Sequence, residues 1–118
     1  MSMEITNRSR ELTEIEEYVM TLDNGIVSMK DVDDGAVIKV SAYLEFTDTK
    51  SDGTTAQLLS ILGEDGVAYS TQSETFKNSF RDIAKVMKDK NFAIIKSSGT
   101  TKNGRAYVNC MLDKSSIK

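Results

Sequence analysis

One change of hydrophobic period constrains the fold of this chain more than any other sequence feature. Apolar and polar residues alternate, as in β-strands, within residues 36–70 and again within residues 91–112. Between these stretches, residues 73–88 carry apolar side chains at the spacing of an α-helix. The order predicts a mainly β domain with one helix inserted between two groups of strands.

The predicted helix has a start signal and an apolar stripe. Thr71-Gln72-Ser73-Glu74 fits a capping box, in which Thr71 accepts from a free amide and Glu74 reaches back. One face of the helix is expected in the core: Phe76, Phe80, Ile83, Ala84 and Met87. The other side is basic: Lys77, Arg81, Lys85 and Lys88. We therefore expect a structural helix with a solvated basic face.

Three strands are predicted before this helix, over Ala36–Thr47, Thr54–Leu62 and Val67–Ser70. The first alternates strongly, with one apolar face expected inward: Ile38, Val40, Ala42, Leu44 and Phe46. Its other face is polar: Lys39, Ser41, Tyr43 and Glu45. The second strand has apolar residues on both faces, so its orientation stays open. The loops TDTKSDG and GEDG connect the three strands.

A hairpin follows the helix, with strands over Asn91–Lys96 and Arg105–Leu112 around the loop SSGTTKNG. In the last strand one face is small and apolar and is expected to face the core: Ala106, Val108, Cys110 and Leu112. The opposite face offers a cation, a ring and an amide to solvent: Arg105, Tyr107, Asn109 and Met111. This polar face is the first place to look for function.

The N-terminal third is different in character. MSMEITNRS is expected to be frayed, and a helix is predicted from Arg10 to Leu22 with one apolar stripe: Leu12, Ile15, Val19 and Leu22. The stripe fits either the domain's own core or another copy of the chain. The segment DVDDG at residues 31–35 is interpreted as a turn, because it lacks the second half and the closing glutamate of a calcium-binding EF-hand loop.

Composition excludes several classes of function. The 118 residues indicate one domain, and they contain no histidine and a single cysteine, Cys110. The usual zinc and non-haem iron sites and the Ser-His and Cys-His catalytic pairs are therefore excluded. We expect no enzyme activity and no cofactor. No apolar run approaches the ~20 residues that span a bilayer, and no signal-peptide pattern begins the chain, so we expect a cytoplasmic protein without a membrane partner.

Charge is divided unevenly along the sequence. The formal net charge is -3, but residues 1–34 contain three Lys or Arg and nine Asp or Glu, a net charge of −6. Residues 35–118 contain twelve basic and nine acidic residues, a net charge of +3. This division favours a basic functional surface beside an acidic segment, although lysines that only solvate a surface would give the same pattern.

Five strands with a helix between the third and fourth is the order of an OB-fold, a small Greek-key barrel. We expect an acidic helical extension over residues 1–34, an OB-fold domain over residues 35–112 and a flexible tail over residues 113–118. In this fold, the loops TDTKSDG and SSGTTKNG and the sheet face between them form the usual ligand groove.

Two segments resemble a known family. GVAYSTQSETFKNSFRDI (Gly66–Ile83) and KSSGTTKNGRAYVNCML are similar to the small single-stranded DNA-binding proteins encoded by tailed bacteriophages of Gram-positive hosts. The resemblance covers about residues 34–112. It implies a non-enzymatic protein that coats and protects single strands during phage DNA replication, in the cytoplasm of the host.

Lysine and arginine neutralise phosphates, and tyrosine rings stack on unpaired bases. The candidate nucleic-acid-binding residues are Lys39, Tyr43, Lys50, Tyr69, Lys96, Lys102, Arg105, Tyr107 and Asn109. The implied partners are single-stranded DNA and phage replication proteins, and the N-terminal helix is a candidate homodimer contact. The alternative is a protein-interaction module on the same barrel, in which Tyr43 and Tyr107 anchor a partner protein.

Overall fold

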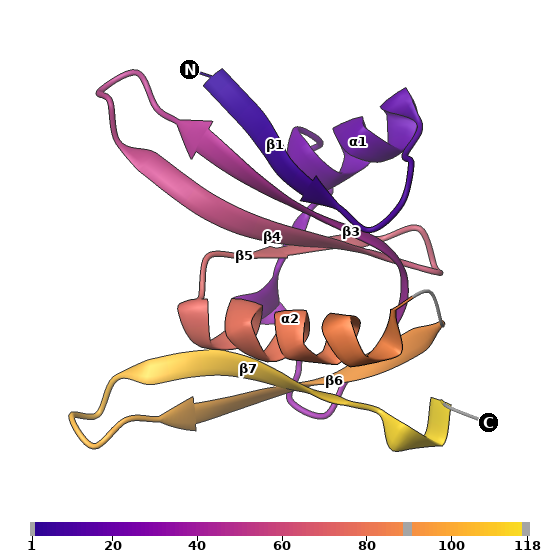
Figure 1. Ribbon diagram of the computed structural model, residues 1–118. Helices are drawn as coiled ribbons and strands as arrows, with labels where there is room; N and C mark the ends of the chain where they lie inside the picture. Colours follow the sequence, from indigo (N-terminus) through magenta and orange to yellow (C-terminus); the bar gives the residue numbers. More distant parts are fainter. Residues whose placement is uncertain (1, 89–90, 117–118) are drawn as a thin grey trace.

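The computed structural model describes residues 2–88 and 91–116. Within these residues the fold is mainly β, with one curled sheet and two α-helices (Figure 1). Its seven strands are β1 (Ser2–Arg8), β2 (Val27–Ser28), β3 (Val37–Thr49), β4 (Thr55–Gly63), β5 (Ala68–Thr71), β6 (Phe92–Thr100) and β7 (Ala106–Leu112). The helices are α1 (Glu14–Thr21) and α2 (Glu74–Met87), with short 3-10 turns η1 (Met29–Asp31) and η2 (Lys114–Ser116).

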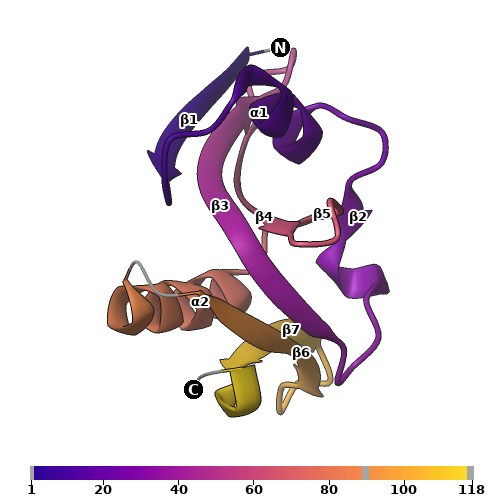
Figure 2. The same ribbon diagram turned by 90° about the vertical axis from the view of Figure 1, so that its right-hand side faces the viewer.

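Strand β3 is the centre of the sheet. The strand order is β2-β5-β4-β3-β6-β7, and β1 also pairs with β3. Residues 37–40 of β3 pair with β6, residues 40–49 pair with β4 and residues 44–49 pair with β1. Figure 2 shows β3 curving through the molecule, so that the sheet forms a half-barrel. Helix α2 lies between the β4–β5 part of the sheet and the β6–β7 hairpin (Figure 1).

Strands β3 to β7 overlap the five segments expected as strands, with β6 extending four residues beyond the expected Lys96, and the sheet also contains β1 and β2, which were not predicted. The prediction of a frayed N-terminus is wrong, because β1 pairs antiparallel with β3. Strand β2 has two residues and pairs parallel with β5. Both are polar or very short, so the hydrophobic period carries no signal for them. The division into domains at residue 34 stays a prediction, although β1 and β2 belong to the same sheet as the other strands.

A β-bulge at Ser41 divides β3 into two halves. Val40 pairs with Gly63 and Ala42 pairs with Leu62, so Ser41 is an extra residue in the ladder. An extra residue reverses the faces of the strand beyond it. Ile38 and Val40 accordingly belong to one core cluster, whereas residues 42, 44 and 46 belong to another. The predicted inward residues are all buried, but they do not share one face as expected.

Both faces of the sheet are covered near β4. The first core contains the stripe of α2, with Phe76 and Phe80 fully buried against β3, β4, β6 and β7. The second core contains Met20 of α1 and residues from β3, β4 and β5. Residues 59 and 61 of β4 face the first core and residue 62 faces the second. The two-sided apolar pattern of Thr54–Leu62 therefore reflects burial on both sides.

The N-cap of α2 lies two residues beyond the predicted Thr71, so the predicted capping box is wrong, and the helix buries one of its lysines. Ser73 is the N-cap, because its hydroxyl accepts from the Phe76 amide at 3.2 Å, whereas Thr71 Oγ1 accepts from the Ser73 amide. Lys77 was expected on the basic outer side but is 1% exposed. Its Nζ lies 2.7 Å from Glu74 and donates to the Gln57 carbonyl at 3.0 Å. These two partners offset the free-energy cost of burying the charge.

Helix α1 is shorter than the predicted Arg10–Leu22 helix, and its predicted stripe is only partly buried. Leu12 and Val19 are half-buried, whereas Ile15 and Leu22 are 75% and 59% exposed, and the buried residue of the helix is Met20, which was not in the predicted stripe. The helix begins with a capping box in which Thr13 Oγ1 accepts from the Glu16 amide and Glu16 accepts from the Thr13 amide. The capping residue thus lies three positions beyond the expected start.

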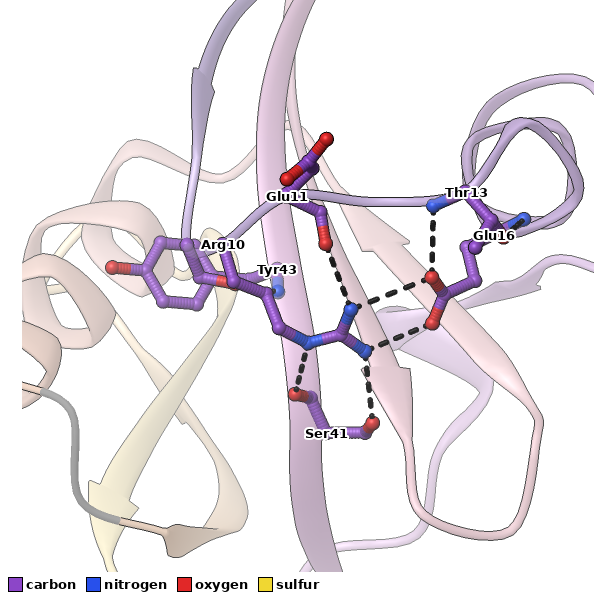
Figure 3. A network of polar contacts seen from close by, with 7 residues as sticks. Arg10, Glu11, Thr13, Glu16, Ser41 and Tyr43 are labelled. Carbon is purple, nitrogen blue, oxygen red and sulfur yellow. Dashed lines mark hydrogen bonds and ion pairs between the residues drawn. The ribbon is translucent and has the colours of Figure 1, made fainter.

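Arg10 joins the start of α1 to the bulge of β3 (Figure 3). Its Nη2 lies 2.8 Å from Glu16 Oε2, and its Nε donates to the Ser41 carbonyl at 3.4 Å. Its Nη1 donates to the carbonyl of Glu11 at 3.0 Å. One guanidinium therefore holds the helix cap, the preceding loop and the irregular point of the central strand together.

Truncation of Phe80 should destabilise the domain, because the ring is fully buried and packs against Tyr43 and Phe92. We expect Phe80→Ala to lower the free energy of unfolding by about 3–5 kcal/mol. Urea unfolding followed by circular dichroism measures this. Val86→Ala on the same helix is the control, since Val86 is 76% exposed. A Phe80→Ala protein as stable as wild type would contradict the prediction.

The Arg10–Glu16 pair predicts a loss of stability in acid. The guanidinium of Arg10, with the Thr13 amide, lowers the pKa of Glu16 from 4.5 to about 2. A depressed carboxyl pKa stabilises the folded state above the unfolded pKa, and that stabilisation is lost as pH falls toward the folded pKa. We therefore expect Glu16→Gln to lower the urea midpoint at pH 7, and the deficit to shrink below pH 4.5 and vanish near pH 2.

Glu14→Gln provides the control for this pH series, because Glu14 lies in the same helical turn and forms no ion pair within the described residues. Its urea midpoint should follow that of the wild type at each pH. A Glu16→Gln deficit that is constant from pH 7 to pH 2 would show that the glutamate acts through something other than its charge.

Candidate nucleic-acid interface

Two tight hairpin loops project from the same side of the molecule, with the link between β5 and α2 lying between them (Figure 1). In the β3–β4 loop the Lys50 amide donates to the Thr54 carbonyl at 2.8 Å. In the β6–β7 loop the Thr101 amide donates to the Arg105 carbonyl at 2.9 Å. The second loop is shorter than the predicted SSGTTKNG, because residues 97–100 continue β6 and pair with β7.

A groove of about 1340 Å³ lies beside the β6–β7 hairpin. It is bordered by η1 and the turn after it, by the β5–α2 link and by the hairpin itself. Three of the predicted site residues line it, namely Lys96, Arg105 and Tyr107. Lys30 also lines it, although no sequence pattern indicated a role for this residue. Only the tertiary course of residues 28–34 brings that lysine to the groove.

The other predicted site residues lie elsewhere. Lys50 and Lys102 are exposed at the two hairpin loops, and Lys39 is exposed on β3. Asn109 is half-buried on β7, and its Oδ1 accepts from the Cys110 amide at 2.9 Å. The structure therefore brings three of the nine predicted residues together in the groove and leaves these four outside its lining.

The remaining two, Tyr43 and Tyr69, pack into the protein. The Tyr43 ring lies edge-on to Phe80, with centroids 5.0 Å apart and planes at 81°. The bulge turns Tyr43 toward α2, so it is not on the open polar face that the alternation predicted. Tyr69 packs against the same core, with its hydroxyl 3.4 Å from Asp65. Burial raises the pKa of both tyrosines, and the nearby carboxylates of Glu45 and Asp65 add to the effect.

Lys96 is a buried member of an ion pair. It is 4% exposed, and its Nζ lies 2.8 Å from Asp34 Oδ1. The other carboxylate oxygen of Asp34 accepts from Ser98 Oγ at 2.6 Å. Hydrogen bonds from Lys96, followed by Ser98, lower the pKa of Asp34. The turn at residues 31–35 is confirmed, and this network attaches it to β6.

The charge of the groove is mixed, but its free charges favour an anion. Two of its carboxylates are already paired, Asp34 with Lys96 and Glu74 with Lys77. Lys30 and Arg105 are exposed and form no ion pair within the part of the chain that is described. They outnumber Asp33, the remaining carboxylate of the lining. Two unpaired cations at one groove can contact phosphates without breaking an internal ion pair.

Tyr107 lies at the cross-strand position of Gly99. It is half-buried, and alternation places it on the same face of β7 as Asn109 and Met111, as predicted. On the opposite face Val108 and Cys110 are buried as expected. Ala106 was also expected inward, but it is exposed, because the tip of the hairpin extends beyond α2 and the core.

The single thiol of the chain, that of Cys110, does not line the groove. Cys110 is 5% exposed, and burial raises the pKa of its thiol to about 12, so it is protonated near neutral pH. Within residues 2–88 and 91–116, no group of three or more Asp, Glu or Cys side chains is arranged to hold a metal ion. None of the helices in these ranges has the length and apolar character needed to cross a membrane.

A model of the family described as Phage Single-stranded DNA-binding protein matches residues 13–113, which is most of the chain. The chain belongs to this family. The resemblance seen in the sequence is thereby confirmed, and the match also includes α1. We found no significant match among curated proteins or among solved structures. Membership of the phage single-stranded DNA-binding family supports single-stranded DNA binding as the general function, in a family that is not enzymatic.

The salt dependence of DNA affinity tests directly whether Arg105 contacts a phosphate. Arg105 is exposed, unpaired in the described residues and next to Tyr107 in the groove. If it contacts one phosphate, Arg105→Ala should reduce the slope of log K against log salt by about 0.7, the value for one single-strand contact. Titration of labelled oligo-dT at several salt concentrations measures the slope.

Lys85→Ala is the matched control, since Lys85 is exposed on α2 and does not line the groove. Its slope should equal that of the wild type. Equal reductions for Arg105→Ala and Lys85→Ala would indicate a diffuse electrostatic effect and would count against a phosphate contact at Arg105.

Proposed function

We propose that this protein coats and protects single-stranded DNA during phage DNA replication, without enzymatic activity. The observation that carries the proposal is the groove beside the β6–β7 hairpin, where Arg105 and Lys30 stand unpaired and Tyr107 is one of the lining residues. Cations that neutralise phosphates and a ring that stacks on bases are the two elements of sequence-tolerant single-strand binding. Family membership supports the same function.

We also propose that the sheet is an OB-fold with two added strands. Strand β3 pairs with β4 and β6, β4 pairs with β5, β6 pairs with β7, and α2 connects β5 to β6. These pairings support the five-strand order β3, β4, β5, β6 and β7, with β1 and β2 as additions. The β3–β4 and β6–β7 loops are then the pair that flanks the ligand in other OB-folds.

In this proposal the single-stranded DNA lies between the β3–β4 and β6–β7 hairpins. Lys50 and Lys102 at the loops meet phosphates outside the groove, and Arg105 and Lys30 meet them inside it. Tyr107 stacks on a base, which contributes about 1–3 kcal/mol and accepts any base. Contacts from the other predicted residues stay predictions: Lys39, Tyr43, Tyr69, Lys96 and Asn109.

A second candidate function is a protein-interaction module, and one observation favours it. Val37, Ile95 and Met111 are directly paired across β3, β6 and β7, and they form a row on the face that carries Tyr107. Val37 is 51% exposed and Met111 is 53% exposed. An exposed apolar row suits a partner protein better than a phosphate backbone. Binding through it would change little with salt, whereas strand coating weakens steeply.

We further propose two kinds of protein partner, a second copy of the chain and phage replication proteins. Ile15 and Tyr18 of α1 and Leu22 at its C-cap are exposed, at spacings of three and four residues. This row supports the proposed homodimer contact through the N-terminal helix. Replication proteins of the phage, met in the host cytoplasm, are the proposed hetero-partners.

The test is a comparison of single-stranded and duplex DNA. The protein should bind oligo-dT more tightly than a duplex of equal length in the same buffer, because a ring cannot stack on bases that are already paired. Fluorescence anisotropy at several salt concentrations measures both affinities. Affinity for oligo-dT should fall steeply as salt rises. Equal or tighter duplex binding would sink the proposal, and salt-independent binding of a protein partner would favour the second candidate.

A further inference from the structure

Gly99 stands in an ordinary strand conformation, so its backbone does not explain the absence of a side chain. Four glycines of the described chain have positive φ and occupy turns, but Gly99 is not among them. It lies within β6, where a glycine weakens the strand and packs nothing. The reason for a glycine at this position must therefore lie in the side chain that packs against it.

The ring of Tyr107 fills the space above Gly99. A methyl carbon built on Gly99 would lie 2.5 Å from Cζ and 3.0 Å from Cε1 of Tyr107, closer than such contacts allow. The two residues are direct cross-strand partners, whose Cβ positions lie about 4.5–5.5 Å apart. The phenol end of the ring can reach Gly99 only by leaning across the hairpin. Any side chain at residue 99 would force the ring to move.

We propose that Gly99 is a positioning residue that holds the Tyr107 ring across the β6–β7 hairpin, ready to receive a base. The proposal rests on the proposed single-stranded DNA binding and identifies how the stacking surface is prepared. A ring that is already held in place loses little conformational freedom when a base binds to it. A ring displaced by a methyl group stands at another angle and must be reordered by each bound strand.

The competing explanation is that the ring only covers a glycine and thereby stabilises the strand, a role known as aromatic rescue. The two explanations differ in what Gly99→Ala does. If the contact is only stabilising, the substitution changes unfolding and leaves DNA affinity unchanged. If Gly99 positions the ring, affinity falls while the fold persists, because the displaced atoms are the movable end of a side chain.

A double-mutant cycle tests the proposal. Oligo-dT affinity and thermal unfolding are measured for wild type, Gly99→Ala, Tyr107→Ala and the double variant. We expect Gly99→Ala to weaken oligo-dT binding about tenfold, within the range that loss of one stacked base allows. The double variant should bind like Tyr107→Ala alone. Ser97→Ala is the control, since Ser97 lies two residues earlier on the same face of β6 and should bind like the wild type.

The position of the ring is measured separately, without DNA. The chain contains no tryptophan, so Tyr107→Trp introduces a single reporter. Acrylamide should quench its emission more strongly when Gly99→Ala is added. Unchanged quenching, or an unchanged oligo-dT affinity of Gly99→Ala, would overturn the positioning role. A wild-type protein that prefers duplex would instead overturn the proposed function, and the quenching experiment would still decide whether Gly99 holds the ring.

Discussion

The extra residue at Ser41 is the constraint on which the arrangement of this domain depends. Strand β3 pairs with three other strands, and the bulge reverses its faces between Val40 and Ala42. One strand thereby contributes to a core under α2 and to another beside α1. Arg10 contacts both the carbonyl of Ser41 and the cap of α1, so the irregular point of the strand is also the point where the N-terminal segment is attached.

The same curvature determines where the candidate interface lies. Because β3 bends, β4 and β5 lie on one side of α2 and the β6–β7 hairpin lies on the other (Figures 1 and 2). The groove lies at the start of α2, between the β5–α2 link and the hairpin, and its unpaired cations come from two segments: Lys30 from η1 and Arg105 from the hairpin. Neither segment forms the interface alone. Sequence patterns within individual β-strands therefore identified only some of its residues.

Sequence patterns predicted which side chains of an element are buried, but not the contacts that depend on other elements. The alternation of residues 38–46 and the helical stripe of Phe76 and Phe80 were sufficient to predict burial, because each signal lies within one element. The direction of Tyr43 could not be predicted, since a bulge is invisible to a period of two. The burial of Lys77 could not be predicted either, because it depends on the carbonyl of Gln57, supplied by a strand twenty residues earlier. The roles assigned to the nine candidate residues stay predictions.

The half-barrel leaves β5 and β7 unpaired with each other in the described chain, and this sets the mechanical character of the groove. A hydrogen-bonded ladder would hold two strands about 4.8 Å apart and allow no adjustment. Here the hairpin is joined to α2 by side-chain packing and by single contacts such as that of Ser73 Oγ with the Val108 carbonyl at 3.3 Å. Side-chain contacts yield more readily than a ladder. The separation of the hairpin from β5 is therefore set by side-chain contacts with α2 and not by a backbone ladder.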